Sequence, residues 1–420
     1  MNFPAMRRAD GGRRVVVTGM AGISPIGQDW PSIRERLEAL QNGVRKMPEW
    51  EVIEGLNTAL AAPVPDYEVP AHYTRRNLRS MGRAACMATT ATERALEDAG
   101  LLGDPSLKDG MTGIAYGASA GESDAIADFG KMIFNNSTEG LSANSYIRMM
   151  SHTSPVNIGV FFGITGRIYT TSSACTSGSQ GIGYAYEAIR FGRQNTMVAG
   201  GCEELTATQA AVFDTLFATS TKNDTPELSP SPFDRDRDGL VIGEGAGTLI
   251  LEELEKALER GATIHAELVG FASNSDGKHV TQPRPETMEK AIRMALLDAG
   301  IEAEQIGYIS AHGSATDRGD IAESLATHAV FGEQTPISAL KSFMGHSLGA
   351  CGGLEAWVAL EMMNNNWFHA TANLNNIDPK CAPLDHIRDE GRSLDCEYIM
   401  TNNFAFGGIN TSLIFKRWNA

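Results

Sequence analysis

The stretch ALEDAG at residues 95–100, followed by TGIAYGAS at 112–119, has a near twin about 200 residues later in the chain. There, ALLDAG at 295–300 leads into IGYISAHGS at 306–314. In both copies an apolar pattern with helical spacing ends at a glycine, a common helix stop, and a short β-rich run follows. The repeated helix–strand unit indicates a duplicated α/β chain.

A second pair of segments supports the duplication. RIYTTSSACTSG at 167–178 is a β-rich run that turns into the small-residue start of a helix at Cys175. TPISALKSFMGHSLGACGG at 335–353 follows the same course around His346. Strands and helices therefore alternate in both halves of the chain, as in α/β proteins.

The repeats divide the chain into two expected halves, residues 13–265 and 266–420. The segment of about 120–165 has no counterpart in the second half, so we expect it to be an insertion in the first. Continuous apolar runs such as TMVAGG at 196–201 are typical of strands in a sheet that is covered on both faces.

Composition excludes several classes of protein. Of the 420 residues, 42% are hydrophobic and 20% charged, which is typical of a folded globular chain rather than a disordered one. No apolar run approaches the roughly 20 residues that span a membrane. The net charge of -16 argues against a nucleic-acid partner. The six cysteines are scattered and lack the spacing of metal ligands, so we expect no metal site. Because the sequence shows no signal peptide, we expect a cytoplasmic protein with free thiols.

Cys175 is the candidate nucleophile. It stands where a strand passes into a helix, and the free N–H groups and dipole of a helix amino end favour a thiolate. The small residues around it leave room for a substrate, and a backbone N–H there can stabilise an oxyanion. The alternative is a small, buried, structural cysteine.

Two histidines are candidate partners of this cysteine. His312 ends a strand and opens a polar loop, and His346 lies in a strand–turn–helix segment five residues after Lys341. The alternative is two structural histidines and a surface lysine. Cysteine and histidine together suffice for acyl transfer. A second imidazole can donate an N–H bond to a thioester oxygen as an enolate forms, which decarboxylative carbon–carbon bond formation requires.

Five motifs occur in order along nearly the whole chain: SSACTSG at 172–178, FDRDRDGLVIGEGAG at 233–247, AHGSATDRGD at 311–320, KSFMGHSLGA at 341–350 and NNFAFGGIN at 402–410. Together they make the chain similar to β-ketoacyl-[acyl-carrier-protein] synthases of the elongating type, synthases I and II, in the thiolase superfamily. The resemblance implies an α/β thiolase fold, with duplicated halves in five α-β-α-β-α layers, and a homodimer.

The resemblance also implies the reaction. An acyl group passes from the phosphopantetheine thiol of an acyl carrier protein to Cys175. A malonyl-carrier then loses CO2, and its enolate attacks the acyl thioester to give a 3-oxoacyl-carrier in fatty acid, polyene or polyketide-like chain elongation. The enzyme itself needs no cofactor, because the carrier holds the pantetheine.

The resemblance assigns roles around the nucleophile. His312 and His346 bind the malonyl thioester carbonyl, and Lys341 supports them electrostatically through a link to Glu323. The backbone N–H groups of Cys175 and Phe406 form the oxyanion hole, and Phe406 gates the acyl pocket.

Further roles concern the carrier and its arm. Ser314, Thr316 and Thr281 contact the pantetheine. The stretch HYTRRNLRSMGR at 72–83 places Arg76 and Arg79 as a docking patch for an acidic carrier, or else forms a solvated helix face. Some relatives hold a monovalent cation at positions that match Ser310, Glu355, Thr401 and Asn402.

Some residues depart from the family pattern. Ala405 replaces a glycine beside the gate, Ile409 a threonine, and Met344 a threonine before Gly345-His346. These changes bear on gate motion and acyl specificity rather than on the chemistry. Two alternatives stay open: a thiolase, which uses a second cysteine as acid and base, and a chain-length-factor-like subunit, which lacks the nucleophile.

Overall fold

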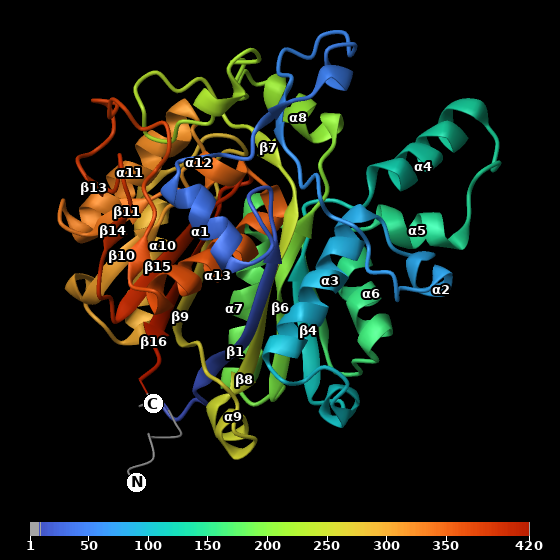
Figure 1. Cartoon of the computed structure of the whole chain (residues 1–420), viewed down its shortest axis with the longest axis horizontal. Helices are drawn as coiled ribbons and strands as arrows, with labels where there is room; N and C mark the ends of the chain where they lie inside the picture. Colours follow the sequence, from blue (N-terminus) through green and yellow to red (C-terminus); the bar gives the residue numbers. More distant parts are fainter. Residues whose placement is uncertain (1–7, 9, 420) are drawn as a thin grey trace.

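An eleven-stranded sheet runs through the computed structural model, which describes residue 8 and residues 10–419 (Figure 1). The strand order is β13-β11-β10-β15-β16-β9-β1-β8-β6-β4-β5. One end of the sheet holds five strands of the first half: β1 (Val15–Ile23), β4 (Thr112–Gly117), β5 (Ile168–Thr171), β6 (Thr196–Glu203) and β8 (Gly245–Glu253). The other end holds β9 (Ala266–Ser275), β10 (Ile306–Ser310), β11 (Pro336–Ser338), β13 (Asp385–His386), β15 (Tyr398–Phe404) and β16 (Ile409–Arg417).

Strand β1 joins the two groups of strands. It pairs antiparallel with β8 along its length and with β9 over residues 15–17. Most strands of the sheet are buried, which explains their continuous apolar runs. Small sheets lie outside it: β2 (Arg45–Lys46) with β3 (Leu60–Ala62) and β7 (Ile242–Gly243), and β12 (Trp367–Phe368) with β14 (Arg392–Ser393).

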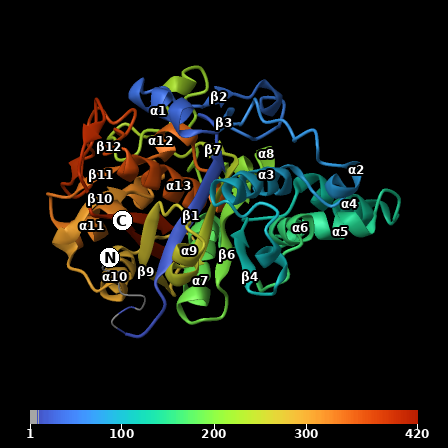
Figure 2. The ribbon, with the colours of Figure 1, turned by 60° about the horizontal axis from the view of Figure 1, so that its bottom comes forward.

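Helices α7 (Ser177–Arg190) and α13 (Cys351–Asn364) form the middle layer. Helix α7 contacts β4 and β6 on one side and β9 and β16 on the other, while α13 contacts β6, β8 and β15. Helices α3 (Arg83–Asp98) and α6 (Thr153–Phe162) cover the outer face of the first group of strands. Helices α10 (Pro285–Ala299) and α11 (Asp317–Phe331) lie on the opposite flank of the molecule (Figures 1 and 2). The five α-β-α-β-α layers of the expected thiolase fold are present.

The repeated units occupy equivalent places in the two halves. Helix α3 precedes β4 as α10 precedes β10, and the glycines that follow them, Gly100 and Gly300, both have φ of 68°. Helices α7 and α13 each follow a 3-10 turn whose first residue, Ala174 or Leu348, has positive φ, at 52° and 44°. Two loops of the same shape therefore meet at the amino ends of the two middle helices.

The segment 120–165 contains α4 (Ser123–Asn135), α5 (Ala143–Met149) and α6. Helix α6 packs on α3, whereas α4 and α5 project from the body of the molecule (Figure 1). Ile133 and Phe134 at the end of α4 are 71% and 83% exposed. The remaining helices are short: α1 (Trp30–Glu38), α2 (Arg75–Leu78), α8 (Ala207–Asp214), α9 (Leu254–Glu259) and α12 (Lys341–Met344). Within the described residues no helix has the length and apolarity to cross a membrane.

Candidate active site

Cys175 lies in the 3-10 turn Ala174–Thr176 that leads into α7. Its neighbours hold the turn: the Ser173 N–H donates to Ser177 Oγ at 2.9 Å, and Ser177 Oγ donates to the Ala174 carbonyl at 2.8 Å. These short-range bonds explain the serine-rich sequence around the cysteine. Cys175 is 3% exposed and lines a cavity of about 450 Å³.

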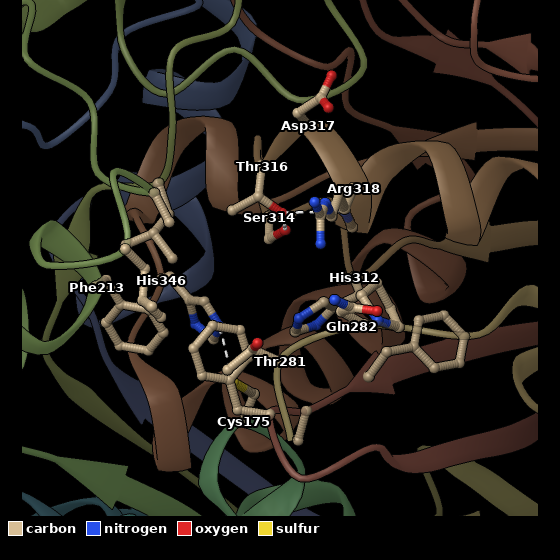
Figure 3. Close-up of a pocket in the computed structure, with 18 of the residues that line it drawn as sticks. Cys175, Phe213, Thr281, Gln282, His312, Ser314, Thr316, Asp317, Arg318 and His346 are labelled. Carbon is tan, nitrogen blue, oxygen red and sulfur yellow. Dashed lines mark hydrogen bonds between the residues drawn. The ribbon is translucent and has the colours of Figure 1, made fainter. Parts of the chain in front are cut away.

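The cavity gathers the predicted site residues from both halves of the chain. His312 follows β10 and His346 follows α12, and both point toward Cys175 (Figure 3). The Nε2 atom of His346 is 3.1 Å from Cys175 Sγ, and the two imidazole centroids are 5.2 Å apart with planes at 83°. The sequence-based convergence of one cysteine and two histidines on one cleft therefore matches the geometry.

Lys341 is buried beside His312, but its carboxylate partner differs from the expected one. The ammonium donates to Glu355 Oε1, to the His312 carbonyl at 2.7 Å and to His312 Nδ1 at 3.2 Å. Among the described residues Lys341 makes no hydrogen bond or ion pair with Glu323, and the two groups interact only through their charges. Glu323 instead accepts the backbone N–H groups of His312 and Gly313, each at 2.7 Å, because α11 places it under that loop.

The hydrogen bonds at Nδ1 assign the same tautomer to both histidines. The Leu348 N–H donates to His346 Nδ1 at 3.1 Å, and the Lys341 ammonium donates to His312 Nδ1. An imidazole nitrogen that accepts a bond carries no proton, so each neutral ring bears its proton on Nε2. Two Nε2–H donors therefore face the cavity.

Burial sets the charge of these groups. Desolvation, together with the positive charge of Lys341, holds the pKa of His312 and of His346 well below the usual range, so both are neutral at pH 7. Burial opposes the charge of Lys341, but Cys351 and Glu355 outweigh it and raise the pKa of the ammonium to about 12. The site therefore combines two neutral imidazoles with one buried cation.

The nucleophile differs from the sequence-based expectation in its charge. Burial raises the pKa of the Cys175 thiol to about 11, although Lys341 and the backbone N–H groups of Phe406 and Cys175 act in the opposite direction. The amino end of α7 therefore does not produce a thiolate in the free enzyme, because desolvation of the sulfur has the larger effect.

The segment that contains Phe406 closes the cavity. The Phe406 ring packs on Phe213 at the end of α8, with centroids 5.0 Å apart. Gly407 and Gly408 make the turn, with φ of 88° and 71°, whereas Ala405 is outside the left-handed region. The alanine in place of the family's glycine thus fits this conformation without strain.

The residues predicted for the pantetheine line the cavity. Ser314, Thr316 and Thr281 all face it, and the Ser314 and Thr316 hydroxyls are 2.9 Å apart (Figure 3). Arg76 and Arg79 lie elsewhere, exposed on and just after α2, and do not line the cavity. Arg83 of the same stretch pairs with the buried Glu244.

The residues expected at a cation site are largely engaged. Glu355 is held by Lys341 and by the Asn403 amide at 2.6 Å, and Asn402 Oδ1 accepts from Ser412. Thr401 Oγ1 is a buried oxygen with no partner among the described residues. Asn403 Oδ1 is a second such oxygen, and a cation at these positions stays an expectation from the resemblance. Among the described residues, the single candidate metal cluster consists of Cys175, His312 and His346 themselves.

Sequence reasoning missed three supports of the site. The resemblance assigns Glu355 only to a cation site, and it assigns no role to Leu348 or Phe213. Glu355 was detectable as an acidic residue one helical turn into the small-residue start of α13. Nothing in the sequence marks the Leu348 N–H. Cys351 donates to the Cys175 carbonyl at 3.2 Å but does not line the cavity, so it is not placed as the acid and base of a thiolase.

Comparison with known proteins agrees with this geometry. The family model "Beta-ketoacyl synthase, N-terminal domain" matches residues 12–257, and the model of the C-terminal domain matches residues 265–375. The chain is 35% identical over 412 residues to 3-oxoacyl-[acyl-carrier-protein] synthase 1 of Haemophilus influenzae, covering 97% of this chain and 100% of the relative.

Solved structures of ketosynthases are also similar to this chain. A β-ketoacyl synthase from Burkholderia phymatum matches with a TM-score of 0.96 and 57% identity over 97% of this chain and 100% of that chain. A chain from the structure of a type II polyketide synthase acyl-carrier protein in complex with its ketosynthase, bound to the hexaketide, matches with a TM-score of 0.85 and 30% identity, over 97% of this chain and 100% of that chain. The chain belongs to the β-ketoacyl synthase family.

Proposed function

We propose that this protein condenses an acyl group held on Cys175 with a malonyl thioester of an acyl carrier protein, with loss of CO2. The observation that supports this most directly is the pair of neutral Nε2–H donors beside the buried thiol in one cavity. The curated relative is a 3-oxoacyl-[acyl-carrier-protein] synthase, a name that describes this product.

The first step loads the enzyme. The Cys175 sulfur attacks the acyl thioester carbonyl, and the N–H groups of Cys175 and Phe406, which favour negative charge on this sulfur, stabilise the oxyanion. The bond between the acyl carbon and the pantetheine sulfur breaks. The carrier thiol leaves with the proton that Cys175 gave up, so the step is neutral overall.

The second step removes CO2 from the malonyl group. Its thioester oxygen accepts hydrogen bonds from the Nε2–H groups of both His312 and His346. In the free enzyme, Cys175 Sγ is the atom that lies 3.1 Å from His346 Nε2. The electrons of the carbon–carboxylate bond move into the enolate, whose negative oxygen these donors stabilise. Because both imidazoles are already neutral donors, no proton needs to move. Lys341 holds His312 in the donor tautomer.

The third step forms the new bond. The enolate carbon attacks the acyl carbon on Cys175, and the same backbone N–H groups hold the oxyanion. When this intermediate collapses, the carbon–sulfur bond breaks and the Cys175 sulfur leaves as a thiolate 3.1 Å from His346 Nε2. A proton taken up from solvent then restores the thiol, since the pKa of Cys175 is raised to about 11. The 3-oxoacyl chain departs on the carrier.

An assay by mass spectrometry tests this function. Acyl- and malonyl-carrier substrates should yield a 3-oxoacyl-carrier product with wild-type protein. Cys175→Ala should abolish condensation yet keep malonyl decarboxylation, because the two histidines remain. Cys86→Ala, which changes another buried cysteine away from the cavity, is the matched control and should condense normally. Condensation by Cys175→Ala at the wild-type rate would show that the nucleophile lies elsewhere.

The carrier protein is the proposed partner, with Arg76 and Arg79 as part of its docking surface. Both side chains are exposed and make no ion pair with any other described residue, and Arg–carboxylate and Arg–phosphate contacts suit an acidic carrier. Arg76→Glu with Arg79→Glu should raise KM for carrier substrates without changing KM for a malonyl thioester of plain pantetheine. An unchanged carrier KM would exclude the patch.

A second copy of this chain is the proposed oligomeric partner. Strand β5 is the last strand at one end of the sheet among the described residues, and the projecting α4 exposes Ile133 and Phe134 (Figure 1). An edge strand and exposed apolar side chains are each suited to contact with another chain. Light scattering should give about twice the chain mass of 45.0 kDa, and Phe134→Asp should lower it. A monomeric wild-type protein would refute the dimer.

A further inference from the structure

Arg318 lies at the outer end of the catalytic cavity. It is the second residue of α11, its side chain is exposed, and it is one of the lining residues. Its guanidinium points into the cavity, on the same side as Ser314 and Thr316 (Figure 3). None of the steps above uses this residue.

The acidic groups around Arg318 are already paired with other cations. The Asp317 carboxylate is 3.6 Å from Arg237 Nη2 and 3.5 Å from Lys380 Nζ. The buried Asp320 is 3.4 Å from Arg237 Nε and accepts the Ala315 N–H. Arg318 makes no ion pair with any residue that the structure describes. Its charge is therefore available to an anion that enters the cavity.

The other arginine of the cavity lining is not available. The side chain of Arg237 is 2% exposed and is held by Asp320 and, at 2.7 Å, by Asp378. It also donates to the Asp317 carbonyl at 3.0 Å. Arg237 therefore fixes the loop that precedes β7 to the start of α11. Arg318, in contrast, is the guanidinium of this lining that can reorient to meet a ligand.

The order of groups along the cavity matches the order of groups along a phosphopantetheine arm. The thioester lies at Cys175, His312 and His346, and the hydroxyls of Ser314 and Thr316 come next. Arg318 follows on the first turn of α11. A phosphopantetheine arm has its thioester at one end, two amides along its length and a phosphate at the other end.

We infer that Arg318 binds the phosphate of the phosphopantetheine arm while the thioester is at the catalytic histidines. This inference rests on the proposed function, since it names a further contact of the same substrate. A guanidinium can give a phosphate two parallel N–H bonds, which are stronger than bonds between neutral groups.

Two malonyl thioesters that differ only in the phosphate test the inference. Malonyl-4′-phosphopantetheine and malonyl-pantetheine are compared as substrates for decarboxylation by wild type, Arg318→Ala, Arg318→Lys and the control Arg235→Ala. Arg235 is an exposed arginine of the neighbouring loop that pairs with Asp236 and does not line the cavity.

Arg318→Ala should raise KM for the phosphorylated thioester about three- to tenfold, the range of a partly exposed charge-assisted contact, and leave KM for malonyl-pantetheine and kcat unchanged. Arg318→Lys should restore part of the loss, and Arg235→Ala should behave as wild type. The difference in KM should shrink as salt is added, because the contact is solvent-accessible. An equal rise for both thioesters, or none for either, would overturn the inference.

Binding without turnover separates this inference from the proposed function. By calorimetry, wild-type protein should bind 4′-phosphopantetheine more tightly than pantetheine, and Arg318→Ala should remove that difference whether or not the protein condenses anything. Malonyl-coenzyme A, which carries further phosphates, distinguishes the source of the ligand. A rise in KM confined to malonyl-coenzyme A, with none for malonyl-4′-phosphopantetheine, would assign Arg318 to coenzyme A and refute a contact with the arm.

Discussion

Replacing Lys341 by methionine tests how the site holds its buried charge. The side chains of Lys341 and Glu355 are each 3% exposed, and the Asn403 amide is the remaining partner of this carboxylate. Removing one member of a buried pair typically costs about 3–5 kcal/mol, because it leaves the other charge desolvated and unpaired. For a chain of 420 residues this corresponds to a fall in Tm of about 3–6 °C.

A second variant separates charge from packing. Lys341→Met combined with Glu355→Gln removes both charges while it keeps a side chain of the same length beside Asn403. It should regain most of the lost Tm in a thermal scan at pH 7.5. A single variant as stable as wild type would contradict the buried pair, because no unpaired carboxylate would then have been created.

The same variants should separate stability from catalysis. Without the Lys341 ammonium, His312 Nδ1 loses its donor and the ring is no longer held with its proton on Nε2. Loss of one preorganised donor to an oxyanion lowers kcat by about 100-fold, so CO2 release from malonyl-carrier should fall by that factor in both variants. Acylation of Cys175, followed by intact mass, should persist. Decarboxylation that recovers in the double variant would refute the role of Lys341 in orienting His312.

Two further predictions concern titration. Since burial raises the pKa of Cys175 to about 11, its alkylation by iodoacetamide should accelerate about tenfold per pH unit between pH 7 and 10; a plateau below pH 9 would show a stabilised thiolate. His386 is buried with both ring nitrogens unpartnered among the described residues, and burial lowers its pKa to about 4. Between about pH 4 and 6.5 the unfolded chain binds a proton there that the folded chain does not, so wild-type stability falls as pH falls. In urea unfolding, the free energy of unfolding of His386→Leu minus that of wild type should therefore be about 2 kcal/mol higher at pH 5 than at pH 7. An equal difference at both pH values would contradict this.

Much of the fold was predictable because the signals are local. The glycines at 100 and 300 end their helices at φ of 68° in both halves, as the repeated sequence predicts. The serines around Cys175 make the hydrogen bonds that hold the turn in which it lies. The serine-rich sequence of that stretch therefore also explains its backbone conformation. The motifs also identified Cys175, His312 and His346 in advance, because each ends a strand or opens a helix at the same edge of the fold.

The partner of Lys341 was not predictable in the same way. Glu323 and Glu355 both lie on helices that begin near the site, and the sequence does not show which carboxylate faces the ammonium. The packing of α13 between the two groups of strands places Glu355 there, while α11 places Glu323 under the backbone of His312.

The sequence by itself determined the duplicated α/β architecture, because periodicity, helix stops and turn-forming residues act over a few neighbours, and its motifs marked Cys175, His312 and His346 as candidates for one cleft. Only the tertiary structure decided the protonation of the site: a thiol rather than a thiolate at Cys175, and neutral imidazoles with Nε2–H toward the cavity. It also left Arg318 without an ionic partner among the described residues at the rim. Desolvation and ion pairing depend on groups that are far apart in the chain, so they are set only when the fold brings those groups together.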